Sequence, residues 1–173
     1  MVVIQRSCGY MMRPSLSVDE IGEICKFVKE INPNCICYVD NCYGEFTDTK
    51  EPIEVGADII AGSLIKNPGG GIAPTGGYIV GRKDLVELAS YRMTSPGMGA
   101  ELGASLANNR LLFQGLFLAP HVVAQAVKSA IFAAAFFDLL GFKTLPAPDT
   151  KRNDIIQAIE MGSKEKLLSL IHI

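Results

Sequence analysis

A lysine and an aspartate stand where two predicted strands end. Lys66 follows the apolar stretch 57–64 and is itself followed closely by the glycines 69–71, whereas Asp40 follows the apolar stretch 35–39. Because ligands of open α/β sheets bind beyond the carboxyl ends of the strands, we expect both side chains to face one crevice. An amine beside a carboxylate in such a place suits Schiff-base chemistry, since only a neutral lysine amine attacks a carbonyl carbon.

The glycines after Lys66 let a backbone or a ligand approach closely, because they carry no side chain. Two phosphate-binding motifs match this segment poorly. A P-loop needs its lysine after the glycines, but Lys66 precedes them. A dinucleotide fingerprint needs G-x-G-x-x-G between a strand and a helix, but the glycine-rich segment 69–77 lies between two predicted strands. The ordinary alternative, a solvated lysine at a turn, stays open at this point.

The elements that must position these residues form an α/β pattern. A strand at 2–4 is followed by a helix that stops at Asn32 and by a second strand at 35–39. Ser17 and Glu20 fit a capping box at the start of this helix. A strand, a helix and a strand within about 40 residues predict a right-handed parallel βαβ unit. One face of the helix is apolar and is expected to be buried: Ile21, Ile24, Cys25 and Val28.

The rest of the chain continues this alternation. Strands are predicted at 57–64 and 77–80, and a helix at 82–93. A long apolar helix is expected to run from Glu101 to Leu140, with a bend near Pro120. The segment that follows, residues 145–154, has the proline and charge content of a linker.

Composition limits the classes of function. The chain has 173 residues, 49% of them hydrophobic, which suffices for one domain with a core or for part of a larger one. The net charge of −2 provides no basic surface for nucleic acid or for an anionic membrane. The five cysteines form no CxxC pair, so we expect small buried hydrophobes in a reducing cytoplasm and neither a metal site nor disulfides. No signal-peptide pattern opens the chain.

The apolar segment 111–142 is long enough to raise the question of a membrane span. It contains Gln114, His121 and Lys128, whereas a span needs about 20 residues nearly free of such groups. We therefore expect a buried helix at a domain or subunit interface.

Two strings carry a resemblance to a known family. "VDNCYGEF" at 39–46 and "GSLIKNPGGG" at 62–71 resemble pyridoxal-phosphate enzymes of the aspartate-aminotransferase fold, and within them the cystathionine lyase and methionine gamma-lyase group. The nearest branch is called the methionine gamma-lyase family or aluminium resistance proteins. "RSCGYMMRPSL" at 6–16 and "NNRLLFQGLFLAPHVV" at 108–123 also match this branch, so the resemblance covers about 1–167. It implies a fold-type-I large domain, a mostly parallel sheet flanked by helices.

The resemblance implies a role for each matched residue. Lys66 matches the lysine that binds pyridoxal 5'-phosphate as a Schiff base, and Asp40 matches the aspartate that pairs with the pyridinium nitrogen. Ser63 matches a serine that touches the cofactor phosphate. The wider lyase group has Ser-x-Thr-Lys here, but this chain has Ile65 before the lysine, so one phosphate hydroxyl is missing.

Before the first helix, the wider group has an Asn-Pro turn whose asparagine contacts the ring hydroxyl of the cofactor. This chain has Arg6, Tyr10 and Arg13 in the corresponding loop. These side chains could line the rim of the site, although the two arginines are equally well explained as surface residues.

The implied function is that of a carbon–sulfur lyase acting on a sulfur-containing amino acid by β- or γ-elimination. Lys66 would remove the α-proton. The resemblance implies a homodimer or homotetramer, and we expect no metal, nucleic acid or membrane partner. The alternative is a non-catalytic α/β interaction module that retains the fold and uses the long apolar helix as an interaction surface.

Full-length relatives of this family are more than twice as long, so the sequence is expected to be a fragment. An upstream part would supply the phosphate-binding glycine loop and the aromatic residue that stacks on the ring, and a downstream small domain most of the site for the substrate carboxylate. We divide the chain into a cofactor-binding large-domain portion at 1–100, the long helix at 101–142 and the start of the small domain at 143–167. Residues 168–173, "LSLIHI", match one reading frame of a common sequencing adapter and are expected to carry no function.

Overall fold

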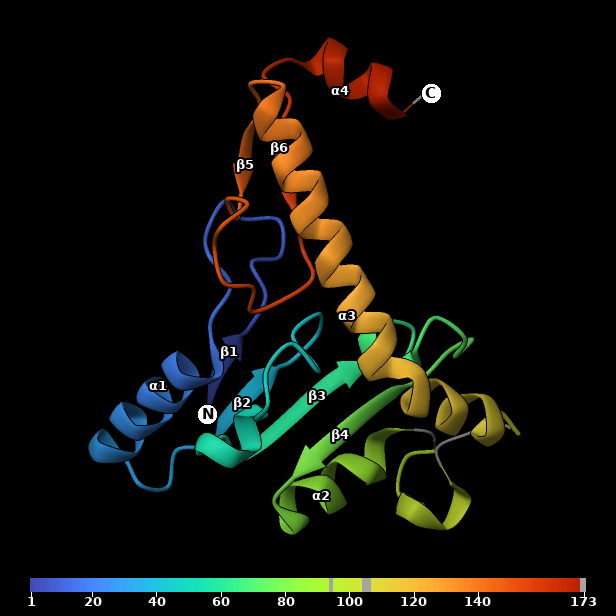
Figure 1. Cartoon of the computed structure of the whole chain (residues 1–173). Coiled ribbons are helices and arrows are strands. Elements are labelled where there is room, and N and C mark those ends of the chain that lie inside the picture. The colour runs from blue at the N-terminus through green and yellow to red at the C-terminus, as the bar shows by residue number, and fades with distance from the viewer. Residues whose placement is uncertain (94, 104–106, 172–173) are drawn as a thin grey trace.

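A computed structural model describes residues 1–93, 95–103 and 107–171 (Figure 1). Its central sheet has the strand order β1-β2-β3-β4. The first three strands are parallel and β4 is antiparallel to β3, so the sheet is mixed. The predicted parallel pairing on either side of the first helix is confirmed. The strands are β1 (Val2–Gln5), β2 (Cys37–Asp40), β3 (Ile59–Ser63) and β4 (Gly77–Gly81).

Helix α1 (Val18–Ile31) connects β1 to β2 and covers the core. The predicted capping box is present, because the Glu20 amide donates to Ser17 Oγ at 3.2 Å and the Ser17 amide donates to Glu20 Oε2 at 2.7 Å. Ile21 and Cys25 are fully buried against the sheet, as their spacing predicts. The other buried members of this core come from the strands and the segment before β3: Ile4, Cys37, Val39, Ala57 and Ile60.

The chain after β4 forms α2 (Lys83–Met93) where a helix was expected. The long helix α3 (Asn109–Leu139) begins later than predicted, because Gly103 and Ala107 both adopt positive φ angles, of 72° and 61°. A right-handed helix cannot continue through such residues. Pro120 lies inside α3. The bend there stays a prediction, and residues 104–106 of the predicted helix lie outside the described residues.

Helix α3 is far more exposed than the sequence led us to expect. The side chains of Phe117 and Leu139 are 84% and 87% exposed. In the most apolar 18-residue stretch of α3, only 17% is buried. Within the described residues it is the one helix long and apolar enough to cross a membrane. The role of α3 at an interface stays a prediction.

After α3, the chain forms a second, two-stranded antiparallel sheet of β5 (Lys143–Leu145) and β6 (Ala158–Glu160). Helix α4 (Lys164–Ile171) follows this sheet (Figure 1). The end of α4 includes part of the suspected adapter segment, whose last two residues lie outside the described residues. The adapter origin and the division into domains stay predictions.

The segment 145–154 is not the free linker that its composition indicated. Asn153 donates its side-chain amide to the Ser15 carbonyl at 3.2 Å, and its own carbonyl accepts from Thr47 Oγ1 at 3.1 Å. Arg152 and Asp154 are buried. The segment therefore packs back onto the loops that follow β1 and β2. Proline and charge alone did not indicate these contacts, because the partners lie more than a hundred positions away in the sequence.

Candidate active site

Lys66 and Asp40 line the same cavity, whose volume is about 630 Å³. Asp40 is the last residue of β2, and Lys66 lies in the turn after β3. Because β2 and β3 are parallel neighbours, their carboxyl ends lie at the same edge of the sheet. The prediction that the two side chains face one crevice is confirmed.

The walls of this cavity come from loops far apart in the sequence. The loop after β1 forms one wall, Cys42 and Tyr43 after β2 form another, and Ile156 contributes from the segment that connects β5 to β6. Besides Asp40 and Lys66, the lining residues are Gln5, Ser7, Cys8, Gly9, Tyr10, Met11, Cys42, Tyr43 and Ile156.

Asp40 is held by the chain that follows it. The backbone amide of Cys42 donates to Asp40 Oδ1 at 3.1 Å. Burial, together with the hydrogen bond and the charge of Asp40, raises the pKa of the Cys42 thiol to about 11. Cys42 therefore remains a thiol at neutral pH, and it supports the carboxylate but supplies no thiolate nucleophile.

Lys66 presents its amine to the cavity beside an aromatic ring. Its Nζ atom lies 5.2 Å from the centroid of the Tyr43 ring, which is a cation–π distance. Within the described part of the chain, this amine has no hydrogen bond or ion pair. The backbone of the turn is closed by bonds from the Lys66 amide to the Ser63 carbonyl and from the Gly69 amide to the Lys66 carbonyl. The amine is therefore available to an incoming group.

The other predicted site residues lie in different places. Ser63 ends β3 but is not among the residues that line this cavity, so its contact with a phosphate stays a prediction. Tyr10 does line the cavity, whereas the Arg13 guanidinium donates to carbonyl oxygens at the end of β1 and in its own loop. Arg6 is fully buried, so a place on the rim was wrong for it.

Arg6 belongs to a buried polar network behind the crevice. It donates to Asn41 Oδ1 at 2.8 Å and forms an ion pair with Glu51 at 3.1 Å. A buried guanidinium is stable only when it is paired and hydrogen-bonded in this way, and the ion pair explains why an arginine is tolerated there. The network fixes the loop 41–47, whose first residues form the wall that bears Cys42 and Tyr43.

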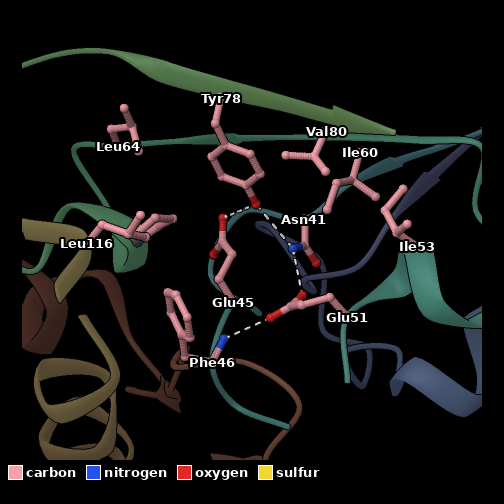
Figure 2. Close-up of a pocket in the computed structure, with 11 residues that line it drawn as sticks. Asn41, Glu45, Phe46, Glu51, Ile53, Ile60, Leu64, Tyr78, Val80 and Leu116 are labelled. Atoms are coloured by element: carbon pink, nitrogen blue, oxygen red, sulfur yellow. Dashed lines mark hydrogen bonds between the residues drawn. The ribbon is translucent and has the colours of Figure 1, made fainter. Parts of the chain in front are cut away.

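The same network borders a second cavity, of about 330 Å³, on the face formed by β3 and β4 (Figure 2). Tyr78 donates its hydroxyl to Glu45 Oε1 at 2.9 Å and accepts from the Asn41 side chain at 3.1 Å. Glu45 is 3% exposed, and this burial raises the pKa of its carboxyl to about 7. The remaining walls are mainly apolar and include Ile60, Leu64, Val80 and Leu116. We did not predict this cavity from the sequence.

Sequence reasoning also missed Cys8, Cys42 and Tyr43 as residues of the crevice. Cys42 and Tyr43 follow Asp40 directly, so their place just after a strand end was a usable signal. Cys8 follows β1 in the same way. All five cysteines were expected to be buried hydrophobes. That is confirmed for Cys8, Cys25 and Cys37, whereas it was wrong for Cys35 and Cys42, which are only half-buried.

Comparison with known proteins shows that the chain is similar to proteins named as lyases. A family model described as methionine gamma-lyase matches residues 1–173. The chain is 57% identical over 166 residues to the uncharacterized protein YnbB of Bacillus subtilis, and the match covers 96% of this chain and 39% of that protein.

Two solved structures have a sequence identity to this chain close to that of YnbB. A protein of Listeria monocytogenes provisionally named a cystathionine beta-lyase involved in aluminum resistance is 56% identical, with a TM-score of 0.93, over 98% of this chain and 42% of that chain. A carbon–sulfur lyase involved in aluminum resistance from Clostridium novyi is 54% identical, with a TM-score of 0.90, over 96% of this chain and 39% of that chain. The chain thus spans 39–42% of the length of these three relatives.

Proposed function

Because the chain belongs to the methionine gamma-lyase family, we propose that it is part of a pyridoxal-phosphate-dependent carbon–sulfur lyase of fold type I, the aspartate-aminotransferase fold. The substrate would be a sulfur-containing amino acid, cleaved by β- or γ-elimination. The observation that carries the proposal is that Lys66 and Asp40, two of the three residues with matched roles, line one cavity.

The residues of the cavity fit pyridoxal phosphate. A primary amine suits an aldehyde, and a carboxylate suits a protonated pyridine nitrogen. The volume of about 630 Å³ lies in the range of small-molecule sites, and Tyr10, Met11 and Tyr43 add the apolar and aromatic surface that a flat ring needs. Lys66 would hold the cofactor through its amine and Asp40 would hold the ring nitrogen.

Each side chain has a task that its position supports. When bound, the cofactor supplies an electron-withdrawing ring that stabilises negative charge at the substrate α-carbon. The Lys66 amine would accept the α-proton, because it lines the cavity and has no hydrogen bond or ion pair within the described residues. The Asp40 carboxylate would accept a hydrogen bond from the ring nitrogen, and the Cys42 amide holds that carboxylate in place.

The test of the proposal is the site of cofactor attachment in the full-length parent protein. The protein is incubated with pyridoxal phosphate, reduced with borohydride and mapped by peptide mass spectrometry. We expect the pyridoxyl group on Lys66. The matched control is Lys83, an exposed lysine at the start of α2, whose substitution by arginine should leave the labelling unchanged, whereas Lys66→Arg should abolish it.

A pyridoxyl group found mainly on another lysine would refute the assignment of Lys66. The alternative, a non-catalytic module, is distinguished by absorbance. A module without a cofactor site produces no new band when pyridoxal phosphate is added, even if the protein is well folded.

We further propose that the parent protein is a cytoplasmic homodimer or homotetramer. The support is the family resemblance together with the apolar side chains that α3 leaves exposed, such as Phe113 and Phe132. Large exposed apolar patches are typical of association surfaces.

A further inference from the structure

The turn that carries Lys66, residues 64–70, is fastened on one side by a single buried amide. Asn67 is 4% exposed and donates both hydrogens of its side-chain amide, to the Tyr43 carbonyl at 3.0 Å and to the Glu45 carbonyl at 3.2 Å. Both acceptors lie in the loop 41–47, which also follows Asp40. The Asn67 side chain therefore connects the turn 64–70, called the lysine turn below, to the wall of the crevice by two hydrogen bonds.

On its other side, the turn touches α3 without any side chain between the two backbones. A Cβ atom on Gly70 would overlap the carbonyl oxygen of Gly115, and a Cβ atom on Gly115 would overlap the carbonyl oxygen of Gly69. Gly70 also has a φ of 57°, which L-residues with side chains adopt rarely. The turn is thus held between the loop 41–47 and α3, and it has little freedom to shift.

We propose that Asn67 is a positioning residue for Lys66, because its amide fixes the distance between the lysine turn and the Tyr43 ring. The 5.2 Å separation of Lys66 Nζ from that ring joins the same two segments that the Asn67 amide joins. No contact between Asn67 and a ligand is needed. This inference rests on the proposed role of Lys66, which it extends by naming what places the amine.

The test uses the 173-residue chain and needs no cofactor. Trace acetylation with acetic anhydride at pH 8, followed by peptide mass spectrometry, gives the rate at Lys66 relative to the exposed Lys83 within the same molecules. In Asn67→Ala the turn is released from Tyr43 and the ammonium loses its ring contact. The relative rate at Lys66 should then rise about two- to fivefold, the factor that corresponds to an exposed cation–π contact.

A double-mutant cycle shows whether Asn67 acts through Tyr43. Tyr43→Leu alone should produce the same rise, and Asn67→Ala should add nothing in that background. Tyr43→Phe keeps the ring and should react like the wild type. The matched control is Asn153→Ala, which also removes an amide-to-carbonyl bond between distant segments but does not touch the lysine turn. It should lower stability without changing the relative rate at Lys66.

Asn67→Ser, which keeps one donor, serves as a second variant if Asn67→Ala does not fold, and its rate should lie between those of the wild type and Tyr43→Leu. An unchanged Lys66 rate in a folded Asn67 variant overturns the proposal, as does an effect that simply adds to that of Tyr43→Leu. A pyridoxyl group on another lysine would instead refute the proposed function and leave this positioning result intact.

Discussion

The buried carboxyl of Glu45 should make the stability of the fold depend on pH. Glu45 is enclosed by the β3–β4 face, and one of its carboxyl oxygens accepts a hydrogen bond from the Tyr78 hydroxyl. Its second oxygen has no partner within the described residues. Burial disfavours the charged form and raises the pKa of Glu45 to about 7. The nearby Glu51 acts in the same direction, whereas a backbone hydrogen bond at Glu45, the Tyr78 hydrogen bond and the charge of Arg6 act against it.

The direction in which stability changes with pH follows from proton linkage. Between the unfolded pKa of 4.5 and the folded pKa of about 7, the folded protein binds a proton that the unfolded chain has released. Stability from Glu45 is therefore fully present below pH 4.5, falls as the pH rises through this window, and is lost above pH 7. At about 1.36 kcal/mol per pKa unit, the difference corresponds to about 3 kcal/mol.

The assay is urea unfolding followed by circular dichroism, at constant protein concentration, at several pH values from 5 to 8. Glu45→Gln removes the titrating group and keeps its volume. We expect the wild type to lose about 3 kcal/mol more than this variant across the window. Other buried acids, such as Asp154, titrate in both proteins and cancel in the difference.

Glu23→Gln, on the exposed surface of α1, is the matched control and should follow the wild-type curve. A Glu45→Gln variant with the same pH slope as the wild type would refute the reasoning, because it would mean that Glu45 ionises in the folded state without a burial cost.

Three further predictions concern the helix cap, the proposed site and the exposed helix. Ser17→Ala removes half of the capping box and should lower the free energy of unfolding by about 1 kcal/mol, as measured in urea; an unchanged midpoint would contradict a role for the cap. In the full-length parent, Asp40→Asn should keep much of the cofactor binding, followed by absorbance, yet lose most of the turnover, because a charge-assisted hydrogen bond worth about 1.5–3 kcal/mol is replaced by a neutral one; wild-type turnover would make Asp40 merely structural. The 173-residue chain alone should bind pyridoxal phosphate weakly and below one equivalent and should self-associate, since Phe117 and Phe132 on α3 are 84% and 71% exposed. Replacing both by glutamine should reduce the particle size in light scattering, and a wild-type monomer that binds one cofactor per chain would show that the site is complete without further segments.

The positions of Lys66 and Asp40 could be predicted because they depend on local patterns. Each follows an apolar strand, and parallel neighbouring strands end at the same edge of a sheet, so the shared crevice required no knowledge of the tertiary structure. The α1 cap was predictable for the same reason, since Ser17 and Glu20 contact each other within one helical turn.

The start of α3 and the course of segment 145–154 could not be predicted from local patterns. Gly103 and Ala107 take positive φ angles that composition does not reveal in an apolar, alanine-rich stretch. The segment 145–154 has a linker's composition, but Asn153 finds partners in the loops after β1 and β2. Tertiary contacts override local preference where the partners are distant in sequence.

The sequence by itself thus determined the family, the α/β order of the elements and the shared crevice of Lys66 and Asp40, because these depend on short-range periodicity and on two compact strings. Only the tertiary structure decided the surroundings of those residues. The ring of Tyr43 beside Lys66, the amide of Asn67 that joins the two, and the burial of Glu45 all arise from contacts between separate segments. Desolvation and packing depend on what surrounds a group in space, and no pattern along the chain encodes that directly.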